Sequence, residues 1–193
     1  MLVIATFSCH SPLAAAESSD SEAIHNVLDS FIGAYFDSDF PRLVSLLHPR
    51  SQRLFREELS AAFDRLLRVY SLGQLSAVSG LPAHPKDLPL SDSEFFVFAC
   101  RQATERHPEV IPDRSFLPFD IRESVFHGDT LDVSLSYFQH VQTERTNYGV
   151  IFPVVVVLQH EPMGWQVLSC PLSRAIATNW KGDLVRAGVT HVR

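Results

Sequence analysis

The sequence predicts an α+β fold in which N-terminal helices pack on a curved antiparallel sheet, as a cone-shaped roll. Apolar residues recur at helical spacing through the first third of the chain, and the apolar period becomes two in the last third. With 193 residues and 46% hydrophobic content, the chain can bury one substantial core. We therefore expect a single domain over residues 22–193, with an extra helix and loops inserted before the strand meander.

Residues 1–16 have the composition of an export leader. They carry no charge, contain an apolar stretch from Leu2 to Phe7, and end in three alanines that suit signal peptidase. We predict a signal peptide and a periplasmic or secreted protein. Because no Lys or Arg precedes the apolar stretch, a truncated start or a cytoplasmic protein remains an alternative. A lipoprotein with its lipid on Cys9 is a further alternative, although the lipobox motif has Leu at the position that Thr6 occupies here.

The first helix follows a polar linker at residues 17–21. Ser19 and Glu22 form a capping-box signature, and the helical apolar spacing continues to about Asp37. This spacing predicts one broad apolar face, made of Ile24, Val27, Leu28, Phe31, Ile32 and Tyr35.

Two more helices are expected before residue 71. Asp39 and Pro41 start a short one, which the His48-Pro49 pair ends. Ser51 is expected to cap the next, which carries apolar residues as far as Tyr70.

The middle of the chain predicts mainly irregular structure. Gly73 to Pro89 is rich in Gly and Pro, so we expect a loop with one short strand at Gln74 to Val78. Ser91 and Glu94 repeat the capping signature and predict a Phe-rich helix that ends at Pro108. A strand is the alternative there, because Phe and Val are good strand formers. A second irregular connection runs to Pro118.

Strands follow from Phe119 onward. Asp120 to Phe126 leads into a turn at His127-Gly128-Asp129, and apolar and polar residues then alternate from Leu131 to Tyr137. From Val150 to Leu158, the residues that alternate to one face and those that alternate to the other are both apolar, which is typical of a strand covered on both faces. The cover would be the helix at 91–107 or a second subunit. The last strand begins near Trp165, after a turn at 162–164.

Four segments resemble the nuclear transport factor 2-like superfamily, which includes ketosteroid isomerase, scytalone dehydratase and polyketide cyclases. They are Ala34 to Asp37, Asp39 to Leu47, His127 to Val133, and Gly164 to Val167. The resemblance implies a cone-shaped α+β fold and a pocket between helices and sheet. Its motifs are structural, so it says little about chemistry, and the segment from 73 to 118 is longer than the pattern.

Catalytic residues are not evident. An isomerase would need a carboxylate base and an acidic donor in a dry pocket, for which Tyr35, Asp120 and Asp132 are available, although the parity of Asp132 puts it on the wet face. Dehydratase chemistry would need a His near an acid. The candidates for that role are His48, His127 and His140.

Cofactors, metals and nucleic acid have no support in the sequence. None of the nine histidines forms a short metal-binding pair, and the net charge of −6 lacks a basic block that would bind phosphates. No stretch is long and apolar enough to predict a membrane span. Cys100 and Cys170 are read as buried thiols, with one disulfide as the alternative.

Two functions therefore remain. The sequence favours a non-catalytic extracytoplasmic module that binds a small apolar molecule or a protein partner. The alternative is a cofactor-free isomerase, dehydratase or cyclase. A carboxyl group within hydrogen-bond reach of a Tyr or His inside the cone would favour the enzyme. We expect a pocket lined by Phe31, Tyr35, Tyr137 and Trp165, and a homodimer formed through the convex face of the sheet.

Overall fold

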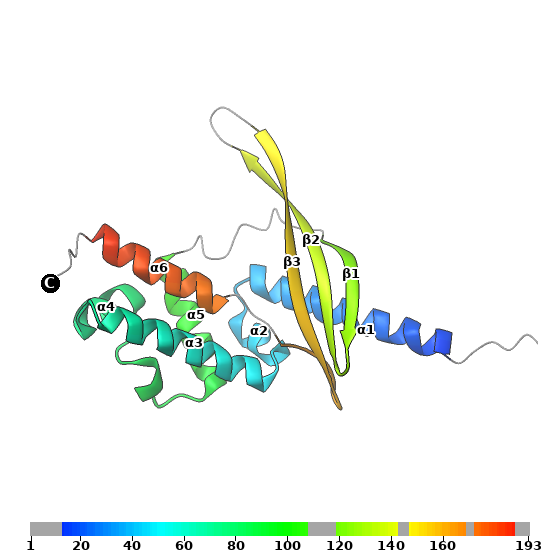
Figure 1. Cartoon of the computed structure of the whole chain (residues 1–193), viewed down its shortest axis with the longest axis horizontal. Helices are drawn as coiled ribbons and strands as arrows, with labels where there is room; N and C mark the ends of the chain where they lie inside the picture. Colours follow the sequence, from blue (N-terminus) through cyan, green and yellow to red (C-terminus); the bar gives the residue numbers. More distant parts are fainter. Residues whose placement is uncertain (1–12, 108–118, 143–146, 169–171, 188–193) are drawn as a thin grey trace, which may run out of the picture.

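Along the chain the helices come first and the strands follow, as the change of period predicts, and one more helix comes after the sheet (Figure 1). The computed structural model describes residues 13–107, 119–142, 147–168 and 172–187. The elements in order are α1 (Leu13–Phe36), α2 (Phe40–Leu46), α3 (Pro49–Leu67), α4 (Leu72–Ser79), η1 (Pro85–Asp87), α5 (Asp92–Arg106), β1 (Phe119–His127), β2 (Thr130–Gln142), β3 (Asn147–Glu161), β4 (Gly164–Val167) and α6 (Leu172–Arg186). The α+β class with an antiparallel sheet is confirmed.

The sheet is a four-stranded antiparallel meander in the order β1-β2-β3-β4. The predicted turn joins β1 to β2, where Gly128 has a φ of 69°, a left-handed conformation that glycine adopts without strain. Strand β1 carries a register shift between Ile121 and Glu123. Helix α1 crosses the sheet and packs on β4 (Figure 1).

The two faces of the sheet differ as the alternation in β2 predicts. Leu131, Val133 and Leu135 are buried, and so are Val156 and Leu158, which pair with them in register. We call this the inner face. Val155 lies on the opposite, outer face and is 57% exposed. Of the two covers that the sequence analysis left open, the helix at 91–107 does not lie on this face, because α5 packs against α2, α3 and α6.

The N-terminal helix is longer than the capping signature indicates. Helix α1 already includes Leu13, so Ser19 and Glu22 lie inside it, and residues 17–21 are helical instead of a linker. Alanine has the highest helix propensity, and Ala14 to Ala16 extend the helix toward the N-terminus. Residues 1–12, which make up most of the predicted signal peptide, lie outside the described residues.

Helices α2 and α3 share one junction. Asp39 caps α2, as predicted, by accepting the backbone N–H of Arg42 at 3.2 Å. The cap of α3 is His48, not Ser51, and Pro49 takes the first helical position. The Ser51 hydroxyl donates instead to the carbonyl of Leu168 at 2.6 Å, and His48 N–H donates to the carbonyl of Val167 at 2.9 Å. The junction is thereby fixed to the end of β4.

The strand expected at 74–78 is wrong, because this segment belongs to α4. Ser71 and Gln74 form a capping box at its start, and Gly80 ends it with a φ of 72°. Helix α5 is confirmed, with the predicted box between Ser91 and Glu94. The Ser91 hydrogen bonds to the Glu94 carboxylate are the main reason why its pKa lies below the usual value.

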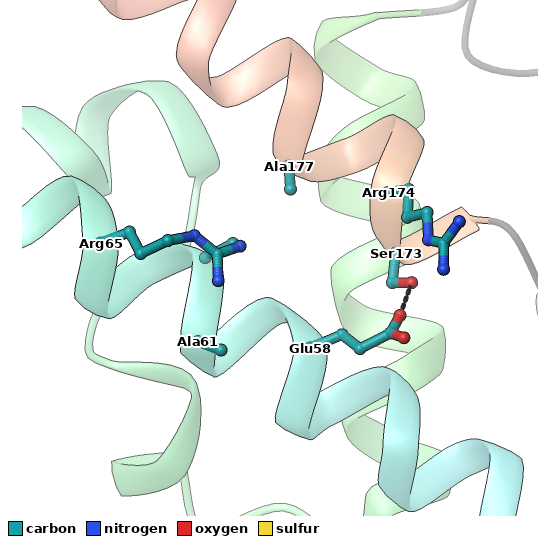
Figure 2. A pocket seen from close by; sticks show the side chains of 7 residues that line it. Glu58, Ala61, Arg65, Ser173, Arg174 and Ala177 are labelled. Carbon is teal, nitrogen blue, oxygen red and sulfur yellow. Dashed lines mark hydrogen bonds between the residues drawn. The ribbon is translucent and has the colours of Figure 1, made fainter.

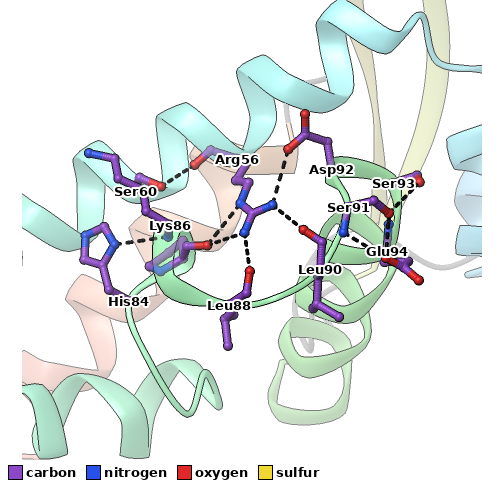
Figure 3. Close-up of polar contacts among 11 residues, drawn as sticks. Arg56, Ser60, His84, Lys86, Leu88, Leu90, Ser91, Asp92, Ser93 and Glu94 are labelled. Atoms are coloured by element: carbon purple, nitrogen blue, oxygen red, sulfur yellow. Dashed lines mark hydrogen bonds and ion pairs between the residues drawn. The ribbon is translucent and has the colours of Figure 1, made fainter.

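The connection between α4 and α5 is ordered around one arginine of α3 (Figure 3). The Arg56 guanidinium donates to the carbonyl oxygens of Pro85 at 2.9 and 3.0 Å, Leu88 at 2.7 Å and Leu90 at 2.6 Å. It also pairs with Asp92 at 3.4 Å and lies over the ring of Phe95. A Gly- and Pro-rich segment thus acquires fixed structure from a distant side chain.

Helix α6 was not predicted. Its buried side chains include Leu172, Ile176, Trp180 and Leu184, which recur every fourth residue. That spacing is a helical signal, and it places one apolar stripe against α3 and α4. Among the residues that the structure describes, no helix combines the length and the apolar character that crossing a bilayer requires.

Candidate functional site

The predicted pocket residues converge only in part on the inner face of the sheet. Phe31 of α1 and Trp165 of β4 are both buried in the core. Tyr35 is half-buried against the same core, and its ring meets Phe36 edge-on at 5.4 Å. The backbone of Tyr137 pairs with Phe152 in the sheet, but its side chain lies outside the described part of the structure.

Trp165 is the unusual member of this group. It is 9% exposed, and its indole Nε1–H has no hydrogen-bond acceptor among the described residues. A buried donor without a partner costs about 1–3 kcal/mol. Phe126 and His160 contact the indole, with ring centroids at 6.2 and 4.9 Å, and Phe126 is 61% exposed. The indole that carries this unsatisfied donor, among the described residues, therefore packs beside an exposed aromatic ring.

The described inner face carries one acid–base group in its strands, the exposed ring of His160, which packs against Trp165. Its buried side chains in β2 and β3 are aliphatic, and Asp132 lies on the outer face, as the alternation along β2 predicts. There it is 3.6 Å from His127 at the exposed end of the sheet. The side chains of Asp120 and His140 fall outside the described part of the structure.

Three histidines bind carboxylates from other parts of the fold, and a proline follows each of them in the sequence. The pairs, with Nε2 to oxygen distances, are His48–Glu161 at 3.1 Å, His84–Asp64 at 3.0 Å and His107–Asp183 at 2.5 Å. Each pair joins two elements, so all three stabilise the packing of the chain.

His48 is the candidate histidine that the structure places closest to an acid. Its Nδ1 accepts the backbone N–H of Arg50 at 3.1 Å, so the neutral ring carries its hydrogen on Nε2 and donates it to Glu161. Both ring nitrogens are engaged, and neither is available to a substrate. The same holds for His84, which accepts from Lys86 N–H and bonds to Asp64.

Two of the paired carboxylates have lowered pKa values. The hydrogen bond from His84 is the main reason why the pKa of Asp64 lies below its usual value. Burial by itself would raise the pKa of Asp183, but hydrogen bonds from Arg186 and His107 outweigh it and lower the pKa. In both cases the lowered pKa follows from hydrogen bonds to a carboxylate, and each histidine bond joins separate elements of the fold.

A cavity of about 210 Å³ lies between α3 and α6 (Figure 2). It is lined by Glu58, Ala61, Ala62, Arg65, Ser173, Arg174 and Ala177. The Ser173 hydroxyl donates a hydrogen bond to Glu58. This cavity could not be indicated by the sequence analysis, because three of its seven lining residues come from α6, a helix that was not predicted. We call it the α3–α6 cavity.

A second, more open groove of about 370 Å³ lies between α2 and α5. Val44, Val97 and Phe98 give it an apolar floor, and Glu94 and Arg101 lie among its lining residues. Glu94 is already engaged in the capping box of α5.

Metal and disulfide chemistry gain no new support from the geometry. Within the described ranges, no three His, Cys, Asp or Glu side chains are arranged to hold a metal ion. Cys100 is buried in α5, and Cys170 lies outside the described residues, so their disulfide stays a prediction.

Comparison with known proteins gives one structural likeness. No family model and no curated protein matches the chain. A crystal structure of a provisionally assigned dehydratase of the nuclear transport factor 2-like family, from Streptomyces avermitilis, is 15% identical. The match covers 79% of this chain and 93% of that one, with a TM-score of 0.35. The fold class accordingly rests on the elements described above.

Proposed function

We propose that the chain is a non-catalytic binding module of the nuclear transport factor 2-like superfamily. Its ligand is a small, mostly apolar molecule that carries one hydrogen-bond acceptor and lies against the inner face of the sheet. The observation that carries the proposal is the buried Trp165 Nε1–H without an acceptor among the described residues. A bound carbonyl or ether oxygen would satisfy this donor.

The surroundings of Trp165 fit such a ligand. The described inner face offers aliphatic side chains, and the exposed ring of Phe126 lies next to the indole. Apolar walls with one placed polar group are typical of sites for small apolar molecules. Catalysis is disfavoured, because His48 uses both of its ring nitrogens and Asp132 lies on the outer face.

Mass spectrometry of small molecules extracted from the natively purified protein tests the proposal. We expect an apolar compound from the wild type, and about tenfold less from Trp165→Phe, since losing a hydrogen bond of about 1.4 kcal/mol lowers affinity tenfold. Trp180→Phe is the matched control, because Trp180 is buried among the helices. Equal recovery from wild type and Trp165→Phe would overturn the proposal.

The enzymatic alternative makes a different prediction for the same extracts. An isomerase or cyclase that removes a proton from carbon would exchange that hydrogen with solvent. After incubation of the protein in D₂O, deuterium in the recovered compound would favour the enzyme. A binding module leaves the compound unlabelled.

We further propose export and self-association. The apolar, uncharged start of the chain supports a leader that is removed after Ala16, so the mature protein should begin at Glu17 by mass spectrometry. Val125 and Val155 expose aliphatic surface on the outer face of the sheet, which supports a homodimer through that face.

A further inference from the structure

We propose that the α3–α6 cavity is a second binding site, for an acidic amino acid. The ligand's carboxylates would bind Arg65 and Arg174, and its ammonium group would bind Glu58. This site is separate from Trp165, which lies in the sheet, and the proposal does not depend on the function proposed above.

The two arginines are the first observation. Arg65 of α3 and Arg174 of α6 both line the cavity, and neither guanidinium group makes a hydrogen bond or an ion pair with another described residue. By contrast, Arg56 of α3 and Arg186 of α6 are both engaged. These two guanidinium groups bring positive charge to one cavity of a protein whose net charge is −6. Guanidinium groups bind carboxylates through paired hydrogen bonds.

Glu58 supplies the opposite charge. Ser173 is 2% exposed and donates its hydroxyl hydrogen to Glu58, which fixes the carboxylate at the cavity. A carboxylate can accept about four hydrogen bonds, so it retains sites for a further donor. Figure 2 shows Arg65 on one side of the cavity and the Glu58–Ser173 pair on the other. The lining therefore recognises a ligand that carries both signs of charge.

The charge balance and the size narrow the ligand class. Two arginines and one glutamate give the lining a net charge of +1, which an acidic amino acid of net charge −1 complements. The cavity of about 210 Å³ is smaller than the roughly 300–1,000 Å³ that drug-sized ligands occupy. Three of its lining residues are alanines, whose short side chains leave room for a ligand of amino-acid size. They are Ala61, Ala62 and Ala177.

Calorimetric titration of the full chain with three probes tests this assignment. L-Glutamate has both carboxylates and the ammonium group, glutarate lacks the ammonium group, and L-glutamine lacks the second carboxylate. We expect L-glutamate to bind at least tenfold more tightly than either of the others, because each missing charge removes one charge-assisted contact with the lining.

Three variants assign the contacts. Arg65→Gln and Arg174→Gln should each weaken L-glutamate about tenfold, while Glu58→Gln should remove the preference for L-glutamate over glutarate. Arg53→Gln is the matched control, since Arg53 is an exposed arginine of α3 outside the cavity. Circular dichroism of each variant establishes that it is folded.

Two results would overturn the proposal. One is the absence of heat from all three probes at about 10 mM, a concentration that detects millimolar dissociation constants. The other is an equal loss of affinity in Arg53→Gln and Arg65→Gln, which would show only a general effect of net charge.

Discussion

Arg56 should be the most important charged residue for the stability of the helical part. We predict that Arg56→Met lowers the free energy of unfolding by about 3 kcal/mol. The wild-type Arg56 side chain is 15% exposed, and its guanidinium donates to three backbone carbonyl groups between α4 and α5 (Figure 3). Met keeps the apolar stem of the side chain, so the change tests the hydrogen bonds more than the packing.

The magnitude follows from these contacts. A hydrogen bond from a charged donor contributes about 1.5–3 kcal/mol, but bonds from one group are not additive. Leu88 and Leu90 are half-buried, so water can reach part of the segment after the substitution. Pro85 is buried, and its carbonyl loses two donors at once. We therefore expect Arg56→Met to lower the free energy of unfolding by about as much as one or two charged hydrogen bonds contribute.

Urea unfolding followed by circular dichroism measures this loss. Arg53→Met on the same helix is the control, because Arg53 is exposed, and we expect it to change stability by less than about 0.5 kcal/mol. Arg56→Lys should recover little, since an ammonium group cannot reproduce the planar fork of donors. If Arg56→Met and Arg53→Met unfold at the same urea concentration, the ordering role of Arg56 is refuted.

Two further predictions concern acid stability and self-association. The pKa of Asp183 is lower in the folded chain, so its contribution to stability is complete above the unfolded value of about 3.9 and is lost as the pH falls through the folded value. Asp183→Asn should flatten the fall in stability below about pH 4, as acid titration of the unfolding free energy would show, and an unchanged slope would contradict this role. Val155 is exposed on the outer face whereas Val156 is buried, so Val155→Asp should give a folded monomer and Val156→Asp an unfolded chain. Light scattering that finds a wild-type monomer at micromolar concentration would exclude the dimer.

More of the fold than of the candidate site could be predicted from the sequence. Capping residues such as Asp39 and Ser91, and the alternation around Leu131, are local signals, and the structure follows them. Gly73 and the nearby prolines predict a loop where α4 forms, although the capping box at Ser71 is a local signal for a helix.

What could not be predicted depends on contacts between distant segments. His48 precedes a proline and was expected to end a helix, but it caps α3 while it bonds to Glu161, 113 positions away. The α3–α6 cavity requires Glu58 and Ser173 to meet across the helix pair, which no local pattern specifies. That the Trp165 indole N–H finds no acceptor among the described residues is likewise a property of the packed interior.

The state of the Trp165 indole N–H tests the central claim most directly. A ¹H–¹⁵N spectrum resolves the indole resonances of the two tryptophans, and Trp165→Phe identifies the one of interest. The spectrum would be recorded on the natively purified protein and again after bound apolar molecules are removed on a hydrophobic resin. We predict that the Trp165 resonance shifts on removal while the Trp180 resonance stays in place, because the ligand's acceptor is lost at Trp165 alone. A Trp165 resonance that is unchanged by this treatment would contradict a ligand on the inner face of the sheet.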